Sequence, residues 1–198
     1  MPLLVFLLIT ALSPGPNNLS CISMGVNYGY KNSIVYIMGI VVGMVTQALI
    51  SGLVSTSLLN LFPKFEAILR VIGAVYILWL AFLTLKSSYI NSENGGNPLG
   101  FKDGFLLQFL NVKAILFVMT VYTAFLAPVL GNLILILIAA LLLGARVFLV
   151  NSVWAMFGST IRRWLSNPIV NKSFNVIVAL LLAYNAADLL GLPKLLFG

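Results

Sequence analysis

The sequence contains no histidine, a single cysteine and only four acidic residues among 198. Zinc and other transition-metal sites draw their ligands mainly from histidine, cysteine and carboxylates, so the usual ligand sets are missing. A Ser-His-Asp triad and a Cys-His pair are excluded too, and Cys21 has no partner for an intrachain disulfide. We therefore expect no metal, no cofactor and no hydrolytic enzyme, and Cys21 should be a small buried apolar residue.

Charge of either sign is also scarce, because charged residues make up 8% of the chain and hydrophobic residues 61%. Soluble globular domains carry about 25% charged and about 45–50% apolar residues, so this chain lacks the polar surface that water requires. The net charge of +7 comes from basic residues scattered singly between apolar segments, which disfavours nucleic acid and favours membrane lipid as the surroundings. The composition predicts an all-α, polytopic membrane protein with a single membrane domain over residues 1–198.

Apolar stretches with few or no charges, separated by charges and turn-forming residues, predict six transmembrane spans. The first, residues 1–28, is uncharged and lacks the basic segment that begins a signal peptide. A stretch rich in Ser, Asn, Gly and Pro, residues 87–102, is too polar to cross lipid and forms the main loop. The other spans are expected at residues 33–62 and 65–85, separated by Pro63, and at about 103–126, 131–157 and 170–190.

Basic residues near the span ends predict the orientation in the membrane. The connections after spans one, three and five contain Lys31, Lys86, Lys102, Arg162, Arg163 and Lys172. The other connections and the tails contain Lys64, Arg70 and Lys194. This bias favours both termini outside, but it is modest and leaves the inverted orientation open.

Two spans contain residues that interrupt a helix. The break in span one consists of Ser13, Pro14, Gly15, Pro16, Asn17 and Asn18. Its prolines remove backbone donors, and the carbonyls freed at this depth need protein or a wet cavity as partners. In span four, Asn111 and Lys113 place an amide and an ammonium where polar groups are costly. We expect both spans to be interrupted helices at a polar site; a packing kink and a lysine that reaches the interface are the alternatives.

The two breaks lie about 95 positions apart, each in the first of three spans. Because three is odd, a duplicated three-span unit enters the membrane in the opposite direction. This is the inverted-repeat plan of many secondary transporters, whose site lies near the midplane. We expect repeat one over about residues 1–86 and repeat two over about 103–190, with Asn17 facing Asn111.

These elements together resemble a known family. The sequence SPGPNN at residues 13–18, the motif Gly73-Ala74-x-Tyr76-x-x-Trp79-Leu80 and the Phe109–Lys113 element resemble the LysE/RhtB amino-acid exporters over almost the whole chain. Two Gly-x-x-x-Gly pairs, Gly25 with Gly29 and Gly39 with Gly43, belong to the same resemblance and suit close helix packing.

The chain departs from most of that superfamily at two positions. Val112 replaces the proline of the usual Asn-Pro-Lys, and Asn17 replaces an aspartate found in many relatives. Asparagine cannot carry a proton, which puts proton coupling through position 17 in question. The Asn-Val-Lys form, with Leu107-Gln108-Phe109 before it and Asn151-x-x-Trp154 after it, is similar to the cysteine/O-acetylserine exporter branch.

The resemblance implies a secondary transporter of the bacterial inner membrane that exports a small zwitterionic amino acid. With the charge bias described above, both termini are expected in the periplasm. Cysteine and O-acetylserine are the favoured substrates, and homoserine, threonine or another amino acid are alternatives within the family. Four acidic residues offer little to neutralise a basic substrate. A non-transporting membrane scaffold explains six spans but not the paired breaks; a membrane enzyme fits less well, and a homo-oligomer stays open.

An amino-acid site must hold a carboxylate and an ammonium away from water. Lys113, near half-helix N-termini, suits the carboxylate. Freed carbonyls at residues 13–16 and the amide oxygens of Asn17, Asn18 or Asn111 suit the ammonium. Other polar residues are candidates for lining the cavity, with packing or interface anchoring as alternatives: Gln47, Tyr76, Arg146, Asn151 and Tyr184. Asp188, near the end of span six, is expected to reach the interface.

Overall fold

The structure is a computed structural model that describes residues 3–12, 15–53, 55–86, 98–162, 164 and 167–191. This part of the chain contains helices and no strand, as the composition predicts. The first half comprises α1 (Leu3–Leu12), α2 (Pro16–Tyr28), α3 (Tyr30–Leu53) and α4 (Ser55–Lys86). The second half comprises α5 (Phe101–Leu110), α6 (Val112–Thr120), a π-helical turn η2 (Val121–Phe125), a 3-10 turn η3 (Ala127–Val129), α7 (Leu133–Ile161) and α8 (Pro168–Leu189).

The two predicted helix interruptions are confirmed. The predicted first span contains two helices, α1 and α2, and α2 begins after Gly15, whose extended backbone serves as the N-cap while Pro16 occupies the first turn. Proline suits that position because its missing N–H would have no partner there. The predicted fourth span breaks at Asn111, and the segments Phe101–Leu110 and Val112–Phe125 meet at an angle of 65°.

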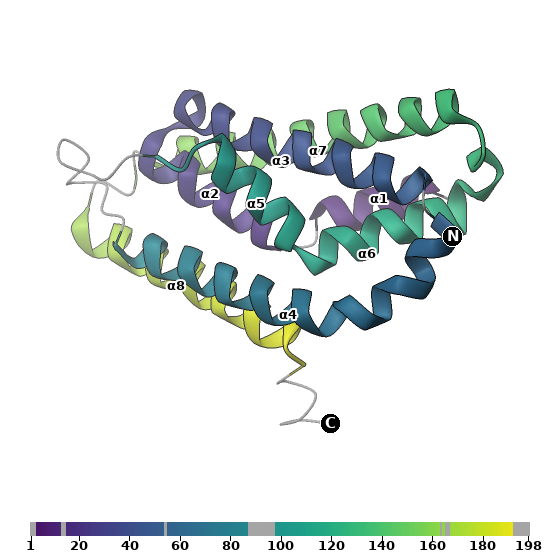
Figure 1. Ribbon diagram of the computed structural model, residues 1–198. Helices are drawn as coiled ribbons and strands as arrows, with labels where there is room; N and C mark the ends of the chain where they lie inside the picture. Colours follow the sequence, from purple (N-terminus) through teal and green to yellow (C-terminus); the bar gives the residue numbers. More distant parts are fainter. Residues whose placement is uncertain are drawn as a thin grey trace.

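The predicted boundary at Pro63 is wrong. Helix α3 ends at Leu53, and α4 continues as one helix from Ser55 through Pro63 to Lys86. A proline inside a helix bends it without always ending it, and Figure 1 shows α4 bending near its N-terminal end. The main loop predicted at residues 87–102 falls largely outside the described residues, and α5 begins at Phe101.

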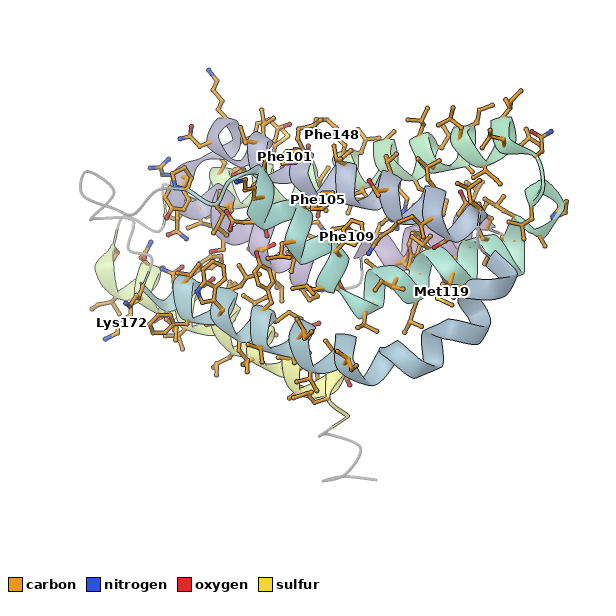
Figure 2. All side chains as sticks on the ribbon, in the orientation of Figure 1. Phe101, Phe105, Phe109, Met119, Phe148 and Lys172 are labelled. Carbon is orange, nitrogen blue, oxygen red and sulfur yellow. The ribbon has the colours of Figure 1, made fainter. Side chains whose placement is uncertain are left out.

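The exterior of the helices is apolar. Among the described residues, α3, α7 and residues Ile169–Leu189 of α8 are long and apolar enough to cross a bilayer. The bent pair of α5 and α6 makes a fourth crossing if it counts as one span. Large apolar side chains project outward along these helices, and Phe101, Phe105 and Phe109 form a row on α5 (Figure 2). Such a surface belongs in lipid, so the chain is a multi-pass membrane protein.

Glycines let the helices approach one another closely at one end of the molecule. Here α2 packs on α7 and α5 packs on α3, while α4 lies alongside α8 (Figure 1). A Cβ built on any of four glycines would collide with backbone of the facing helix: Gly25 with Ala155, Gly158 with Ile22, Gly39 with Phe101, and Gly104 with Tyr36. The packing role predicted for Gly25 and Gly39 is therefore confirmed. Gly29 serves a turn instead, since its φ of 80° ends α2.

Candidate functional site

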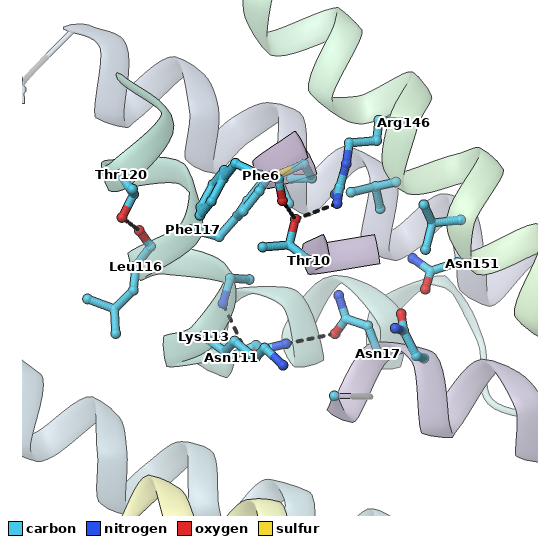
Figure 3. Close-up of a pocket in the computed structure, with 16 residues that line it drawn as sticks. Phe6, Thr10, Asn17, Asn111, Lys113, Leu116, Phe117, Thr120, Arg146 and Asn151 are labelled. Carbon is cyan, nitrogen blue, oxygen red and sulfur yellow. Dashed lines mark hydrogen bonds between the residues drawn. The ribbon is translucent and has the colours of Figure 1, made fainter. Parts of the chain in front are cut away.

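A cavity of about 260 Å³ lies between α1, α2, α6 and α7 (Figure 3). Both helix interruptions open onto it, so residues from distant parts of the sequence share its wall. Of the site residues predicted from the sequence, the cavity brings together Gly15, Asn17, Asn18, Asn111, Lys113, Arg146 and Asn151. Apolar side chains, including Phe6, Phe117 and Val147, form much of the rest of its lining.

A chain of side-chain amides runs from the cavity wall into the protein. Asn111 Nδ2 donates to Asn17 Oδ1 at 3.0 Å (Figure 3), which confirms that the two asparagines face each other. Asn17 Nδ2 donates to Gln108 Oε1 at 2.7 Å, and Gln108 Nε2 donates to Gln47 Oε1 at 2.7 Å. Gln47 Nε2 returns to the Gln108 carbonyl at 2.9 Å. These bonds tie the start of α2 to α3 and to the α5–α6 break.

Gln108 was not predicted as a site residue. The available signal was a polar amide in an apolar span, three residues before Asn111. Its side chain is fully buried and uses both its donor and its acceptor, so it sits at the centre of the amide chain. A buried amide of this kind fixes a unique arrangement, because any other placement leaves polar atoms without partners.

Replacing Gln108 with leucine should lower the thermal unfolding midpoint of the purified protein in detergent. The change removes the partners of Asn17 Nδ2 and Gln47 Oε1, and each buried polar group left unsatisfied costs about 1–3 kcal/mol. The Gln47→Leu/Gln108→Leu double variant should lose less stability than the sum of the two single variants, because the residues share one hydrogen bond. An unchanged midpoint in Gln108→Leu, or strict additivity, would contradict this arrangement.

Asn111 explains how span four breaks without a proline at position 112. Its backbone is extended, with φ −84° and ψ 92°, and its Oδ1 accepts the Ala114 N–H at 3.3 Å. The same residue therefore ends α5 and caps α6. Asparagine is among the best N-cap residues, so Asn111 can start α6 although no proline follows it.

Lys113 lies in the first turn of α6, and its side chain reaches Gly15, the N-cap of α2. A Cβ built on Gly15 would stand 3.5 Å from Lys113 Nζ and 3.6 Å from its Cδ, so the ammonium lies against Gly15. Both helix N-termini carry a partial positive charge, and the ammonium adds a full one. Three positive contributions at one corner of the cavity suit an anionic group such as a carboxylate.

Arg146 holds α1 against the cavity. Its Nη2 donates to the Leu7 carbonyl at 2.6 Å and to Thr10 Oγ1 at 2.8 Å, and its guanidinium lies 4.8 Å from the Phe117 ring centroid. The Ala11 carbonyl, at the end of α1, accepts from Asn18 Nδ2 at 3.3 Å and from Trp154 Nε1 at 3.4 Å. Side chains of α2 and α7 therefore donate hydrogen bonds to backbone carbonyls in the last two turns of α1.

Several predicted residues lie away from the cavity lining. Tyr76 donates from its hydroxyl to the Asp103 carbonyl at 2.9 Å and joins α4 to α5. Tyr184 is 61% exposed on α8, and Asp188 is exposed near the end of that helix. Gln47 acts through the amide chain, and Pro16 is buried in α2. Ser13 and Pro14 lie outside the described residues.

Comparison with known proteins gives consistent results. The LysE type translocator family model matches residues 8–191. A protein of Klebsiella pneumoniae named cysteine/O-acetylserine efflux protein is 36% identical over 183 residues, 92% of each chain. Proteins of the same name from Salmonella choleraesuis and Escherichia coli K12 are 34% and 32% identical over 181 residues, 91% of this chain and 92% of theirs. No solved structure matches the chain.

Proposed function

Because the chain belongs to the LysE-type translocator family, we propose that it exports small neutral amino acids from the cytoplasm, with cysteine and O-acetylserine as its favoured substrates. The relatives that carry this name extend over nine-tenths of the chain, and the residues matched by the family model, 8–191, include both helix breaks. Homoserine and threonine are the alternative substrates within the family. The scaffold alternative accounts for neither the cavity nor the cation beside it.

The observation that carries the proposal is the position of Lys113. Its ammonium, beside the N-termini of α2 and α6, gives one corner of the cavity a positive potential that binds the substrate carboxylate. Polar side chains elsewhere in the cavity lining supply a group for the substrate ammonium. A zwitterion therefore finds a partner for each charge within a cavity of about 260 Å³.

The substrate side chain meets neutral surroundings. The described cavity lining includes Met44, Val147 and Val150, and it includes no carboxylate. A lysine or arginine substrate would add a positive side chain to a lining that already contains Lys113 and Arg146 and, among the described residues, no carboxylate. Burying an uncompensated charge is strongly unfavourable, which favours neutral amino acids over basic ones.

We assign six spans in two inverted repeats to this transporter. In this assignment α1 with α2 and α5 with α6 are the broken first spans of the repeats, and α3, α4, α7 and α8 are the others. The packing supports it: α3 packs on α7 and α4 on α8, and each pair joins the corresponding spans of the two halves. The protein is placed in the bacterial inner membrane with both termini in the periplasm, following the distribution of basic residues.

The proposal is tested by reconstituting the purified chain in lipid vesicles loaded with labelled cysteine or O-acetylserine. Efflux should exceed that of protein-free vesicles for both compounds and should fall to that background for lysine. Efflux from vesicles loaded with threonine distinguishes cysteine and O-acetylserine from the alternative substrates, homoserine and threonine. Vesicles that release none of these amino acids faster than protein-free vesicles would reject the exporter.

A further inference from the structure

The substrate ammonium needs a hydrogen-bond acceptor, and most acceptors at the helix breaks are already in use. Asn17 Oδ1 accepts from Asn111, and Asn111 Oδ1 accepts the Ala114 N–H. The Gly15 carbonyl accepts the Leu19 N–H at 3.0 Å inside α2. Thr10 Oγ1 already receives Arg146. Each of these oxygens already accepts one hydrogen bond, so an acceptor without a partner elsewhere on the cavity wall is better placed to bind the ammonium.

Asn151 provides an acceptor that the fold leaves unused. The residue lies on α7, is 2% exposed and lines the cavity. Its Oδ1 is buried and has no hydrogen-bond partner among the described residues. A buried amide oxygen without a partner costs about 1–3 kcal/mol, so such atoms are rare in folded proteins and mark places where a ligand or water binds.

The position of Asn151 complements that of Lys113. Lys113 reaches the cavity from α6, whereas Asn151 reaches it from α7 (Figure 3). Arg146, also on α7, directs its guanidinium to α1 and offers donors but no acceptor. Among these α7 side chains, only the Asn151 amide can accept a hydrogen bond from an ammonium, and a half-turn about its Cβ–Cγ bond exchanges oxygen and nitrogen toward the cavity.

We propose that Asn151 Oδ1 accepts a hydrogen bond from the α-ammonium of the substrate and thereby selects amino acids over carboxylic acids that lack the amine. The inference rests on the proposed function and identifies the group that binds the ammonium of the zwitterion. Lys113 alone would bind any small carboxylate. A site built to bond an N–H rejects the analogue without it far better than an apolar wall does, because its buried acceptor is left unpaired.

The test compares cysteine with 3-mercaptopropionate, which has the same thiol and carboxylate but hydrogen in place of the amine. Both are added as competitors of labelled cysteine transport in vesicles that contain equal amounts of protein. In the wild type, 3-mercaptopropionate should compete at least about tenfold more weakly than cysteine. In Asn151→Leu, the cysteine concentration for half-maximal competition should rise by about tenfold, while that for 3-mercaptopropionate stays unchanged, so the discrimination disappears.

Two further variants separate recognition from folding. Asn151→Asp keeps an acceptor at this position and should keep the preference for cysteine even if its transport rate changes. Asn185→Leu removes an amide that bonds the Leu181 carbonyl of its own helix at 2.7 Å and should leave both competition constants unchanged.

The outcomes separate this inference from the proposed function. If wild-type vesicles transport cysteine but Asn151→Leu weakens both competitors equally, or neither, the assignment of Asn151 is wrong and the exporter stands. The same holds if Asn151→Asp loses the discrimination. If wild-type vesicles move neither cysteine nor O-acetylserine, the proposed function fails and the assignment fails with it.

Discussion

Replacing Lys113 with methionine should reduce transport of cysteine by more than tenfold. Methionine keeps much of the side-chain volume but removes the ammonium that lies against Gly15. Losing one partner of a desolvated, hydrogen-bonded charge pair costs about 2–5 kcal/mol, which corresponds to well over a tenfold loss of binding. The folded state should tolerate the change, since it removes a costly charge from the membrane-spanning region. Concentration-dependent efflux from reconstituted vesicles measures the effect.

Lys102→Met is the matched control, because Lys102 belongs to the same predicted span as Lys113 but lies at its exposed N-terminal end. Lys102 lies on the first turn of α5, away from the cavity, so Lys102→Met should transport cysteine at the wild-type rate. Thermal unfolding in detergent should give similar midpoints for Lys113→Met, Lys102→Met and the wild type. Transport by Lys113→Met at the rate of Lys102→Met would show that Lys113 does not bind the carboxylate.

Replacing Pro14, Gly15 and Pro16 together with alanine should abolish efflux while the protein still inserts. Relative to alanine in a helix interior, proline costs about 3 kcal/mol and glycine about 1 kcal/mol, so the variant lets α1 and α2 join into one helix. The N-terminus of α2 would then disappear, and with it part of the positive corner at Lys113. Efflux of labelled O-acetylserine at equal protein content measures the result.

Pro128→Ala serves as the control for this change. Pro128 lies in the 3-10 turn η3 that leads to α7, outside the cavity lining, and its replacement should leave efflux intact. If the triple variant exports as fast as Pro128→Ala, the break in span one only shapes packing. Such a result would also favour the scaffold class, which needs no half-helix end.

The interruptions of spans one and four could be predicted because they depend on local chemistry. Two prolines around a glycine cannot continue a helix without losing hydrogen bonds, and an asparagine before an apolar run caps a new one. The pairing of Asn17 with Asn111 followed from their matching places in the two halves, and the hydrogen bond between them confirms it.

Other features depend on contacts that no local pattern reveals. Gln108 bonds Asn17 and Gln47, which lie 91 and 61 positions away, so its role depends on how α2, α3 and α5 assemble. Tyr76 was expected in the cavity, yet α4 packs so that its hydroxyl reaches the Asp103 carbonyl instead. Pro63 looked like a span boundary, but a long helix accepts it by bending.

The glycine contacts make the two ends of the molecule unequal in how they can open. Where α2 meets α7 and α5 meets α3, the backbones lie close together at Gly25, Gly158, Gly39 and Gly104, so opening these contacts requires the helices themselves to separate. At the other end, α1 and α6 meet largely through side chains, with Phe6 stacked on Phe117 at 5.6 Å between centroids. Rotamer changes occur within nanoseconds, whereas separating whole helices takes microseconds to milliseconds. We therefore expect substrate access to the cavity from the α1 and α6 end to be fast. Opening of the glycine-packed end should be the rate-limiting step of transport across the membrane.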